Sequence, residues 1–218
     1  MVKVALLPAK PLLLAKTRLG PLLEARERMA MAGAMFTDVL NALNKAAALD
    51  TVIVITADPN LALRAHRTGA VVVDEGTPLG LNGAVGLGTE AALRLGATSV
   101  LVVLSDIPLV LPADIDELLA RAPVHGALVV PSKEGTGTNA MLRQPPTIFP
   151  SHFGGRSLER YVRAAERSNL TCEIVLSARI GFDLDTPEDL RAFAARESPT
   201  ETYRAVLRLG STMLRPSA

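Results

Sequence analysis

The 218-residue chain is poor in the residues that build several common kinds of binding site. It has no tryptophan, and aromatic residues make up only 3% of it, so the stacking platforms that bind single-stranded nucleic acid are not expected. Its one cysteine, Cys172, permits neither an internal disulfide nor a zinc site built from cysteines. Its histidines, at positions 66, 125 and 152, lie far apart and lack metal-ligand spacing.

Charge of one sign and long apolar runs are also scarce. The formal net charge is +1, so no overall field attracts the chain to nucleic acid or to a lipid surface. No run of about 18 uncharged apolar residues occurs, and the opening MVKVALLPAK has too short an apolar run for a signal peptide. We therefore expect a cytoplasmic protein that binds neither nucleic acid nor membranes and holds any anionic ligand with a local cluster of cations.

What the sequence does contain is a series of short Val/Ile/Leu runs that alternate with helical patterns. These runs are almost continuously apolar, which is typical of parallel strands covered on both faces. Strands are predicted at residues 2–7, 51–56, 70–74, 99–104, 127–130 and 172–176. Helices are predicted at residues 22–49, 59–68, 81–95 and 112–121, from 157, and after 187.

This alternation predicts an α/β fold with a sheet between layers of helices. The length suits one domain, which we place at residues 1–198, with the C-terminal third continuing the same sheet. Residues 199–218 are expected to form an extension with a short amphipathic helix. The sequence leaves open whether the chain forms a homodimer.

Polar residues gather where the predicted strands end, which is where open parallel sheets bind ligands. The apolar run LVVLSDIPLV delivers Asp106 at a strand tip. The loop after the first strand carries Lys10, Lys16 and Arg18, whose charges can grip a triphosphate. It is not a P-loop, because GxxxxGK[ST] is absent. A solvated basic loop explains the same three charges equally well.

Two further loops have the composition of anion sites. Residues 135–139, GTGTN, combine flexible glycines with hydroxyl and amide donors, although a hairpin turn before residues 140–142 is the commoner explanation. Ser157 opens a helix whose free amides can bind an anion, although an ordinary helix cap is the simpler explanation of a single serine.

An acidic cluster lies in the segment GFDLDTPEDL. If this segment is extended, Asp183 and Asp185 point the same way. Helix capping explains Asp185 and the residues after it, but it does not explain Asp183. Together with Asp106 from another strand tip, the two carboxylates would suit Mg²⁺, which takes hard oxygen ligands.

Six segments, in this order, resemble the guanylyltransferases of coenzyme F-420 biosynthesis, which act on 2-phospho-L-lactate or phosphoenolpyruvate. They are PAKPLLLAKTRLGP, PLGLNGAV, LVVLSDIPLV, GTGTNAM, FGGRS and DLDTPEDL. The resemblance runs from residue 2 to about residue 195. It implies a three-layer α/β/α fold of the nucleotide-diphospho-sugar transferase type with a mostly parallel mixed sheet, GTP as a substrate, and Mg²⁺.

The resemblance also implies roles for individual residues. The metal ligands fall at Asp106, Asp183 and Asp185; Lys16 lies in the phosphate-binding loop; Gly80, Leu81 and Asn82 lie near the nucleotide; and Thr138, Gly154 and Ser157 lie where the small phosphorylated acid is held. The chain departs from the family pattern at Tyr161, a position where the family often has histidine.

The implied reaction transfers GMP from GTP to the acceptor phosphate and releases pyrophosphate. The acceptor phosphate, whose second pKa is about 6, is ionised at pH 7 and can attack without a general base. Mg²⁺ on the carboxylates, with Lys16 and Arg18, would neutralise the repulsion between the two polyanions, and Lys10 would help to hold the nucleotide.

Two alternatives stand beside this interpretation. Another nucleotidyltransferase of the same fold, acting on a molybdopterin or a sugar phosphate, is disfavoured because the LAGGxSxRxG opening is missing. A non-catalytic nucleotide-binding regulator is disfavoured because three carboxylates are retained. The sequence leaves open the choice among phosphoenolpyruvate, 2-phospho-L-lactate and 3-phosphoglycerate, and the strictness for guanine.

Overall fold

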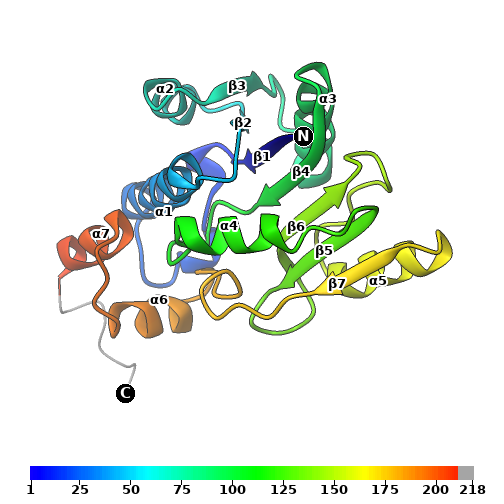
Figure 1. The fold of residues 1–218 in the computed structure, drawn as a ribbon. Helices are drawn as coiled ribbons and strands as arrows, with labels where there is room; N and C mark the ends of the chain where they lie inside the picture. The colour runs from blue at the N-terminus through cyan, green and yellow to red at the C-terminus, as the bar shows by residue number, and fades with distance from the viewer. Residues whose placement is uncertain (211–218) are drawn as a thin grey trace.

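Within residues 1–210, which the computed structural model describes, seven strands form one mixed sheet with helices on both faces (Figure 1). The strands are β1 Val2–Pro8, β2 Thr51–Thr56, β3 Val71–Asp74, β4 Ala97–Val103, β5 Gly126–Pro131, β6 Thr138–Gln144 and β7 Thr171–Ile174. Their order across the sheet is β3-β2-β1-β4-β6-β5-β7. All neighbouring pairs are parallel except the two made by β6. The predicted mostly parallel mixed sheet is confirmed.

The helices fall into two groups, one on each face of the sheet. In chain order they are α1 Ala25–Lys45, α2 Pro59–Arg67, α3 Gly80–Arg94, α4 Pro112–Ala120, α5 Ser157–Arg167, α6 Pro187–Ala194 and α7 Glu201–Leu209. One core contains side chains of α1, α2, α4, α6 and α7, and the other contains side chains of α3 and α5. The chain thus has the predicted three layers.

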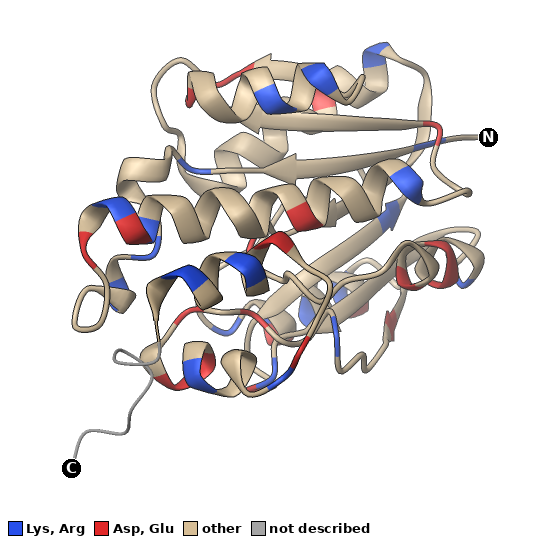
Figure 2. Ribbon diagram, turned by 90° about the vertical axis from the view of Figure 1, so that its left-hand side faces the viewer, with Lys and Arg blue, Asp and Glu red and all other residues tan. Residues whose placement is uncertain are grey.

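The continuously apolar strands are explained by this double cover. In β1, Ala5 and Leu7 face the core beneath α1, whereas Val4 and Leu6 face the core beneath α3. All four side chains are fully buried. A strand that is buried on both faces needs no polar alternation. The charged residues lie mainly on the helices and loops outside the sheet, where Figure 2 shows both signs of charge interspersed.

Most predicted elements are confirmed, with ends shifted by up to four residues. The first helix, predicted at residues 22–49, is shorter and spans Ala25–Lys45. The loop after β1 contains two short 3₁₀ helices, Leu12–Leu14 and Thr17–Leu19. Strand β6 was not predicted, and residues 132–137 form the turn between β5 and β6. The hairpin explanation of the GTGTN segment is therefore correct, with residues 135–137 in the turn and residues 138–139 at the start of β6.

The predicted C-terminal helix is present as α7, which packs against α1 and α6 (Figure 1). Val206 is buried in this contact, and the rings of Tyr203 and Phe193 have centroids 6.4 Å apart. Residues 211–218, the end of the predicted extension, lie outside the described residues. No helix among the described residues is long and apolar enough to cross a membrane.

Candidate active site

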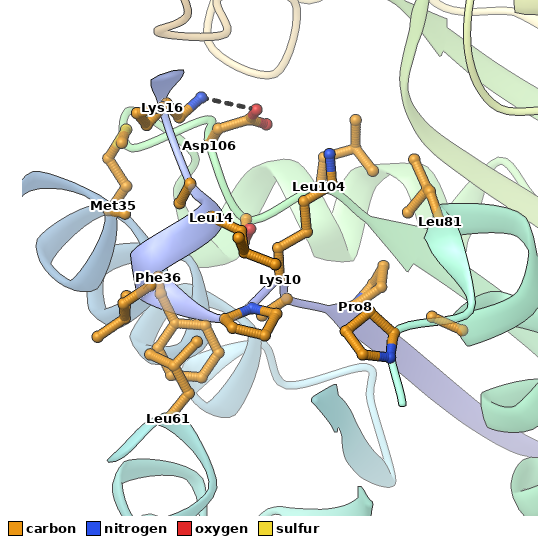
Figure 3. A pocket seen from close by; sticks show the side chains of 18 of the residues that line it. Pro8, Lys10, Leu14, Lys16, Met35, Phe36, Leu61, Leu81, Leu104 and Asp106 are labelled. Carbon is orange, nitrogen blue, oxygen red and sulfur yellow. Dashed lines mark hydrogen bonds and ion pairs between the residues drawn. The ribbon is translucent and has the colours of Figure 1, made fainter. Parts of the chain in front are cut away.

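A cavity of about 690 Å³ opens beyond the carboxyl ends of β1 and β4 (Figure 3). Its walls come from the loop after β1, the start of α3, the middle of α1 and the segment after β4. Met35, Phe36 and Leu81 supply apolar surface, while Lys16 and Asp106 meet at one end. Cavities of about 300–1,000 Å³ with a few convergent polar groups are typical of small-molecule sites.

Lys16 is the centre of the polar end of this cavity. Its Nζ lies 2.9 Å from Asp106 Oδ2 and 2.6 Å from Asp185 Oδ1. Arg18 Nη1 lies 3.6 Å from Asp185 Oδ2, while its side chain remains 74% exposed. The fold therefore brings together charges that are 90 and 169 positions apart in the sequence.

Backbone geometry helps to direct Lys16 inward. Its φ of 53° is in the left-handed region, which is unusual for a residue with a Cβ, and its side chain is only 8% exposed. Burial acts to lower the pKa of Lys16, but the nearby carboxylates of Asp106 and Asp185 outweigh burial and raise it. Lys16 is therefore a buried, permanently charged ammonium at neutral pH.

Asp106 has one carboxylate oxygen without a partner. Oδ2 accepts from Lys16, but Oδ1 is buried and has no hydrogen-bond partner among the described residues. The backbone carbonyl of Asp106 accepts from Leu184 N at 3.0 Å, which holds the segment carrying Asp183 and Asp185 beside it. A buried carboxylate oxygen without a partner is costly, so it points to a ligand that is bound there during function.

Asp183 is the carboxylate of this group that forms no ion pair among the described residues, although Lys133 Nζ donates to its backbone carbonyl at 3.1 Å. Its Oδ1 accepts from Asn139 Nδ2 at 3.2 Å, and the same amide also donates to the carbonyls of Ile180 and Gly181. Burial raises the pKa of Asp183, and the negative charge of Asp106 adds to the rise. A cation placed between these two carboxylates would relieve both effects.

The three predicted metal ligands nevertheless do not converge as a ready-made metal site. Among residues 1–210, no group of three or more His, Cys, Asp or Glu side chains lies in a metal-holding arrangement. The ammonium of Lys16 bridges Asp106 and Asp185 instead. The donor set and the orphan Oδ1 of Asp106 fit a hard cation, provided that Lys16 gives up one of its two carboxylate contacts.

The residues predicted to hold the phosphorylated acid form a second group. Ser157 Oγ donates to Thr138 Oγ1 at 3.1 Å, and both side chains are buried. Gly154, exposed and with a φ of 110°, adopts a conformation that a larger residue would strain. These residues lie around the first turn of α5 and the start of β6, and they do not line the 690 Å³ cavity.

The residues predicted near the nucleotide divide between these two places. Lys10, Gly80 and Leu81 line the cavity. Asn82 instead makes two hydrogen bonds to the backbone of Phe153, from Nδ2 to the carbonyl at 3.0 Å and from the Phe153 amide to Oδ1 at 2.8 Å. Its polar atoms thus join the start of α3 to the loop that carries Gly154.

Several residues of the site were not found from the sequence. Met35 and Phe36 line the cavity from α1, but their helical spacing is indistinguishable from that of core residues. Glu75 also lines the cavity, and its position directly after a strand was the available signal. Tyr161 is fully buried and its hydroxyl accepts from His152 N at 2.8 Å, so it supports the loop rather than facing a ligand.

The chain has a three-layer fold of the nucleotide-diphospho-sugar transferase type, with a cavity lined by lysines and carboxylates at the carboxyl edge of its sheet. Solved structures agree on the fold. A protein described as a nucleotide-diphospho-sugar transferase from Desulfovibrio desulfuricans superposes with a TM-score of 0.80 at 18% identity, covering 98% of this chain and 97% of that one. Glucosyl-3-phosphoglycerate synthase from Mycobacterium tuberculosis, solved with Mg²⁺ and UDP, superposes with a TM-score of 0.58 at 14% identity, covering 80% of this chain and 69% of that one.

The sequence comparison identifies the family. Residues 3–215 match the family described as Guanylyl transferase CofC like, so the chain belongs to it and is a guanylyltransferase that uses GTP. It is 39% identical over 194 residues to phosphoenolpyruvate guanylyltransferase of Conexibacter woesei, covering 88% of this chain and 87% of the relative. It is 34% identical over 194 residues to 3-phospho-D-glycerate guanylyltransferase of Colwellia psychrerythraea, covering 88% and 91%. The resemblance seen in the sequence motifs is thereby confirmed.

Proposed function

We propose that this guanylyltransferase moves GMP from GTP to the phosphate of a three-carbon phosphorylated acid, with phosphoenolpyruvate as its acceptor, in a Mg²⁺-dependent reaction. The observation that carries the proposal is the cluster at the end of the cavity, where Lys16 bridges Asp106 and Asp185 and leaves Asp106 Oδ1 unpartnered. Phosphoenolpyruvate is favoured by the name of the relative that is 39% identical.

Asp106, Asp183 and Asp185 are the residues that would hold the metal. A bound Mg²⁺ shields the charge that builds up on phosphate oxygens during the transfer. Burial and the negative charge of Asp106 raise the pKa of Asp183, and a cation held between the two carboxylates would oppose both effects. Lys16, released from one carboxylate, would then reach the triphosphate from its buried position.

The side chains then act by charge and alignment rather than by proton transfer. The acceptor phosphate is already a dianion near neutral pH, so one of its oxygens attacks the α-phosphorus of GTP directly. A P–O–P bond forms between the acceptor phosphate and the α-phosphorus. The bond from the α-phosphorus to the oxygen that bridges it to the β-phosphorus breaks, and pyrophosphate leaves with that oxygen and the electron pair of the broken bond. Lys16, Arg18 and Lys10 neutralise the triphosphate and the leaving group.

The acceptor is assigned to the second group of residues. The hydroxyls of Thr138 and Ser157 are hydrogen-bonded to each other at the first turn of α5. The amides of Ser157 and Leu158 donate to the carbonyls of Gly154 and Thr136, so the hydroxyls are the donors offered to an anion here. Gly154 lets the backbone approach the ligand closely without strain. The candidate acids differ by a double bond or a hydroxyl, so one or two contacts here decide which acid is used.

The test is pyrophosphate release from the purified protein with GTP and Mg²⁺, offering phosphoenolpyruvate, 2-phospho-L-lactate and 3-phosphoglycerate separately. We expect release that requires an acid and is fastest with phosphoenolpyruvate. Release with 3-phosphoglycerate alone would keep the reaction and correct the acceptor. No release with any acid, in a preparation that binds GTP, would contradict the proposed function.

A further inference from the structure

Helix α3 and the loop before α5 are joined by reciprocal hydrogen bonds between one side chain and one backbone residue. Asn82 Nδ2 donates to the Phe153 carbonyl at 3.0 Å, and the Phe153 amide donates to Asn82 Oδ1 at 2.8 Å. The two residues are 71 positions apart. Because both ends of the side-chain amide are used, this contact fixes the position and the orientation of the Phe153 backbone together.

A second polar connection joins the same two segments further along α3. Arg143 of β6 is 3% exposed; its Nη1 donates to the Phe149 carbonyl at 2.8 Å and its Nη2 to Thr89 Oγ1 at 2.9 Å. Thr89 lies two helical turns after Asn82. Residues 149–157, here called the acceptor loop, are thus held against α3 at Phe149, where the loop begins, and at Phe153, in its middle.

The two ends of this connection face different ligands. The first turn of α3 lines the cavity assigned to GTP through Gly80, Leu81 and Ala84. Phe153 directly precedes Gly154 and lies four residues before Ser157, both assigned to the acceptor. Asn82 therefore lies between the two binding places, with its polar atoms committed to the acceptor loop.

We infer that Asn82 is a positioning residue that couples GTP binding to acceptor binding, an inference that rests on the proposed function. Helix α3 begins at Gly80, which has a φ of 74°. A Cβ placed on Gly80 would meet no atom within 4 Å, so no neighbouring side chain packs against its backbone there. A nucleotide packed on Gly80 and Leu81 fixes this first turn. Through Asn82 the same contact fixes the Phe153 backbone, so the acceptor site is ordered in advance and the acceptor binds more tightly.

The alternative is a direct contact between Asn82 and the nucleotide. Such a contact would have to break both hydrogen bonds to Phe153. The Phe153 amide would lose its acceptor, and its carbonyl would keep only the longer contact from Arg160 Nη2 at 3.4 Å, which is costly. Asn82 is also absent from the residues that line the cavity, whereas Gly80 and Leu81 are present. The two roles give different binding results.

The experiment measures the binding of each ligand with and without the other, by calorimetry in the presence of Mg²⁺. The probes are phosphoenolpyruvate and a GTP analogue with a methylene group between the α- and β-phosphorus atoms, which cannot transfer GMP. The variants are Asn82→Ala, Asn82→Asp, and the control Asn60→Ala, which removes an exposed asparagine from the first turn of α2. Asn82→Asp keeps the acceptor for the Phe153 amide and loses the donor to its carbonyl.

In the wild-type chain and in Asn60→Ala, each ligand should tighten the other by the same factor, about five-fold or more. In Asn82→Ala this factor should fall below about two-fold, while each ligand alone keeps its affinity within about three-fold. Asn82→Asp should lose most of the coupling as well. In steady-state assays with the other substrate saturating, the KM for the acceptor and the KM for GTP should both rise, as reciprocal coupling requires.

Three results would overturn the inference. One is coupling in Asn82→Ala equal to that of the wild type. Another is a loss of affinity for the GTP analogue alone with coupling retained, which would make Asn82 a nucleotide contact. The third is no coupling in the wild type. Acid-dependent pyrophosphate release in the same preparation separates these results from failure of the proposed function, which would abolish that release.

Discussion

Among the charged residues of the candidate active site, Lys16 is buried and lies closest to the carboxylates of Asp106 and Asp185. Lys16 bridges these two carboxylates, and the carboxylate of Asp183 is left with only an amide partner. Such a group contributes less to the free energy of folding than apolar side chains of the same size would. Buried charges offset their loss of hydration only when their partners are well placed. Asp106 Oδ1, which has no hydrogen-bond partner among the described residues, is an acceptor that a ligand could use.

Asp106→Asn tests this account most simply. Asparagine keeps the shape of the side chain but removes the charge that holds Lys16 and would hold the metal. We expect turnover to fall by about 100-fold or more, in the range seen when one electrostatic group of an active site is lost. Circular dichroism should be unchanged.

The matched control for this variant is Asp50→Asn. Asp50 accepts from Lys3 N at the amino ends of the strands, opposite the cavity, and asparagine keeps that acceptor. This control should retain wild-type turnover. A near-wild-type rate for Asp106→Asn would remove Asp106 from the catalytic group.

Cys172 gives a prediction about reactivity. Burial raises the pKa of its thiol to about 11, so at pH 8 only about one molecule in a thousand carries the thiolate. Alkylation by iodoacetamide at pH 8 should therefore be roughly 100-fold slower in the native protein than in urea, where the pKa returns to about 8.5. The rate should climb about ten-fold per pH unit below the pKa. Equal rates in the two states would show that the thiol is not shielded.

The start of α7 is capped by Thr200, whose Oγ1 accepts from Tyr203 N, and by a carboxylate of α1. Asp38 accepts from Glu201 N at 2.7 Å, from Thr202 N at 2.8 Å and from Thr202 Oγ1 at 2.6 Å. It thereby satisfies the free amides at the start of α7 from a neighbouring helix. Helix α7 thus packs in the same hydrophobic core as the residues of α1 that line the cavity.

Asp38→Ala should therefore loosen α7. We expect a loss of about 1–3 kcal/mol in the free energy of unfolding, because the amides at the helix start and the Thr202 hydroxyl lose their acceptor. Hydrogen exchange should accelerate in α7 before it does in the sheet. Asp38→Asn, which keeps one acceptor oxygen, should lose less. Unchanged exchange in α7 after Asp38→Ala would contradict this role.

The elements that could be predicted are those whose own residues determine them. Strands β1, β2 and β4 are continuous apolar runs, and α2 begins at a proline after a capping aspartate. Strand β6 reads TNAMLRQ, without a run of β-branched residues, and it places Arg143 in the interior. It is a strand because β4 and β5 pair with it on both sides, and such tertiary context overrides local propensity.

The proximity of three residues of the candidate site could be predicted for related reasons, while their roles stay predictions. Asp106, Lys16 and Asp185 lie where strand ends and their loops converge, so the sheet alone brings them together. The partner of Asn82 is a backbone group 71 positions away, and no side-chain pattern records such a contact. The support that Tyr161 gives to His152 N is hidden for the same reason.

For the molecule as a whole, recognition of GTP has to be local, because the net charge is only +1. Binding of GTP with Mg²⁺ to the native chain should nevertheless stabilise all of it. At a free concentration of about 100 times Kd, the gain is about 2.7 kcal/mol, or roughly 5–10 °C in Tm for a chain of this size. Thermal unfolding with GTP alone, Mg²⁺ alone and both together measures this.

GTP and Mg²⁺ together should raise Tm by more than the sum of their separate effects. The reason is that phosphate oxygens would bind the metal and the metal would reduce the negative charge of the phosphates. Asp106→Asn should remove most of that excess and leave the shift with GTP alone largely in place. A shift with GTP that is independent of Mg²⁺ would contradict a metal held by Asp106 and its neighbours.

The most direct test of the central claim is phosphorus NMR of a reaction that contains the protein, GTP, Mg²⁺ and phosphoenolpyruvate. Transfer of GMP to the acceptor phosphate predicts two new, mutually coupled diphosphate resonances that grow together with pyrophosphate, at the expense of GTP and phosphoenolpyruvate. Formation of GMP and pyrophosphate, or of GDP and phosphate, with phosphoenolpyruvate unconsumed would contradict the claim.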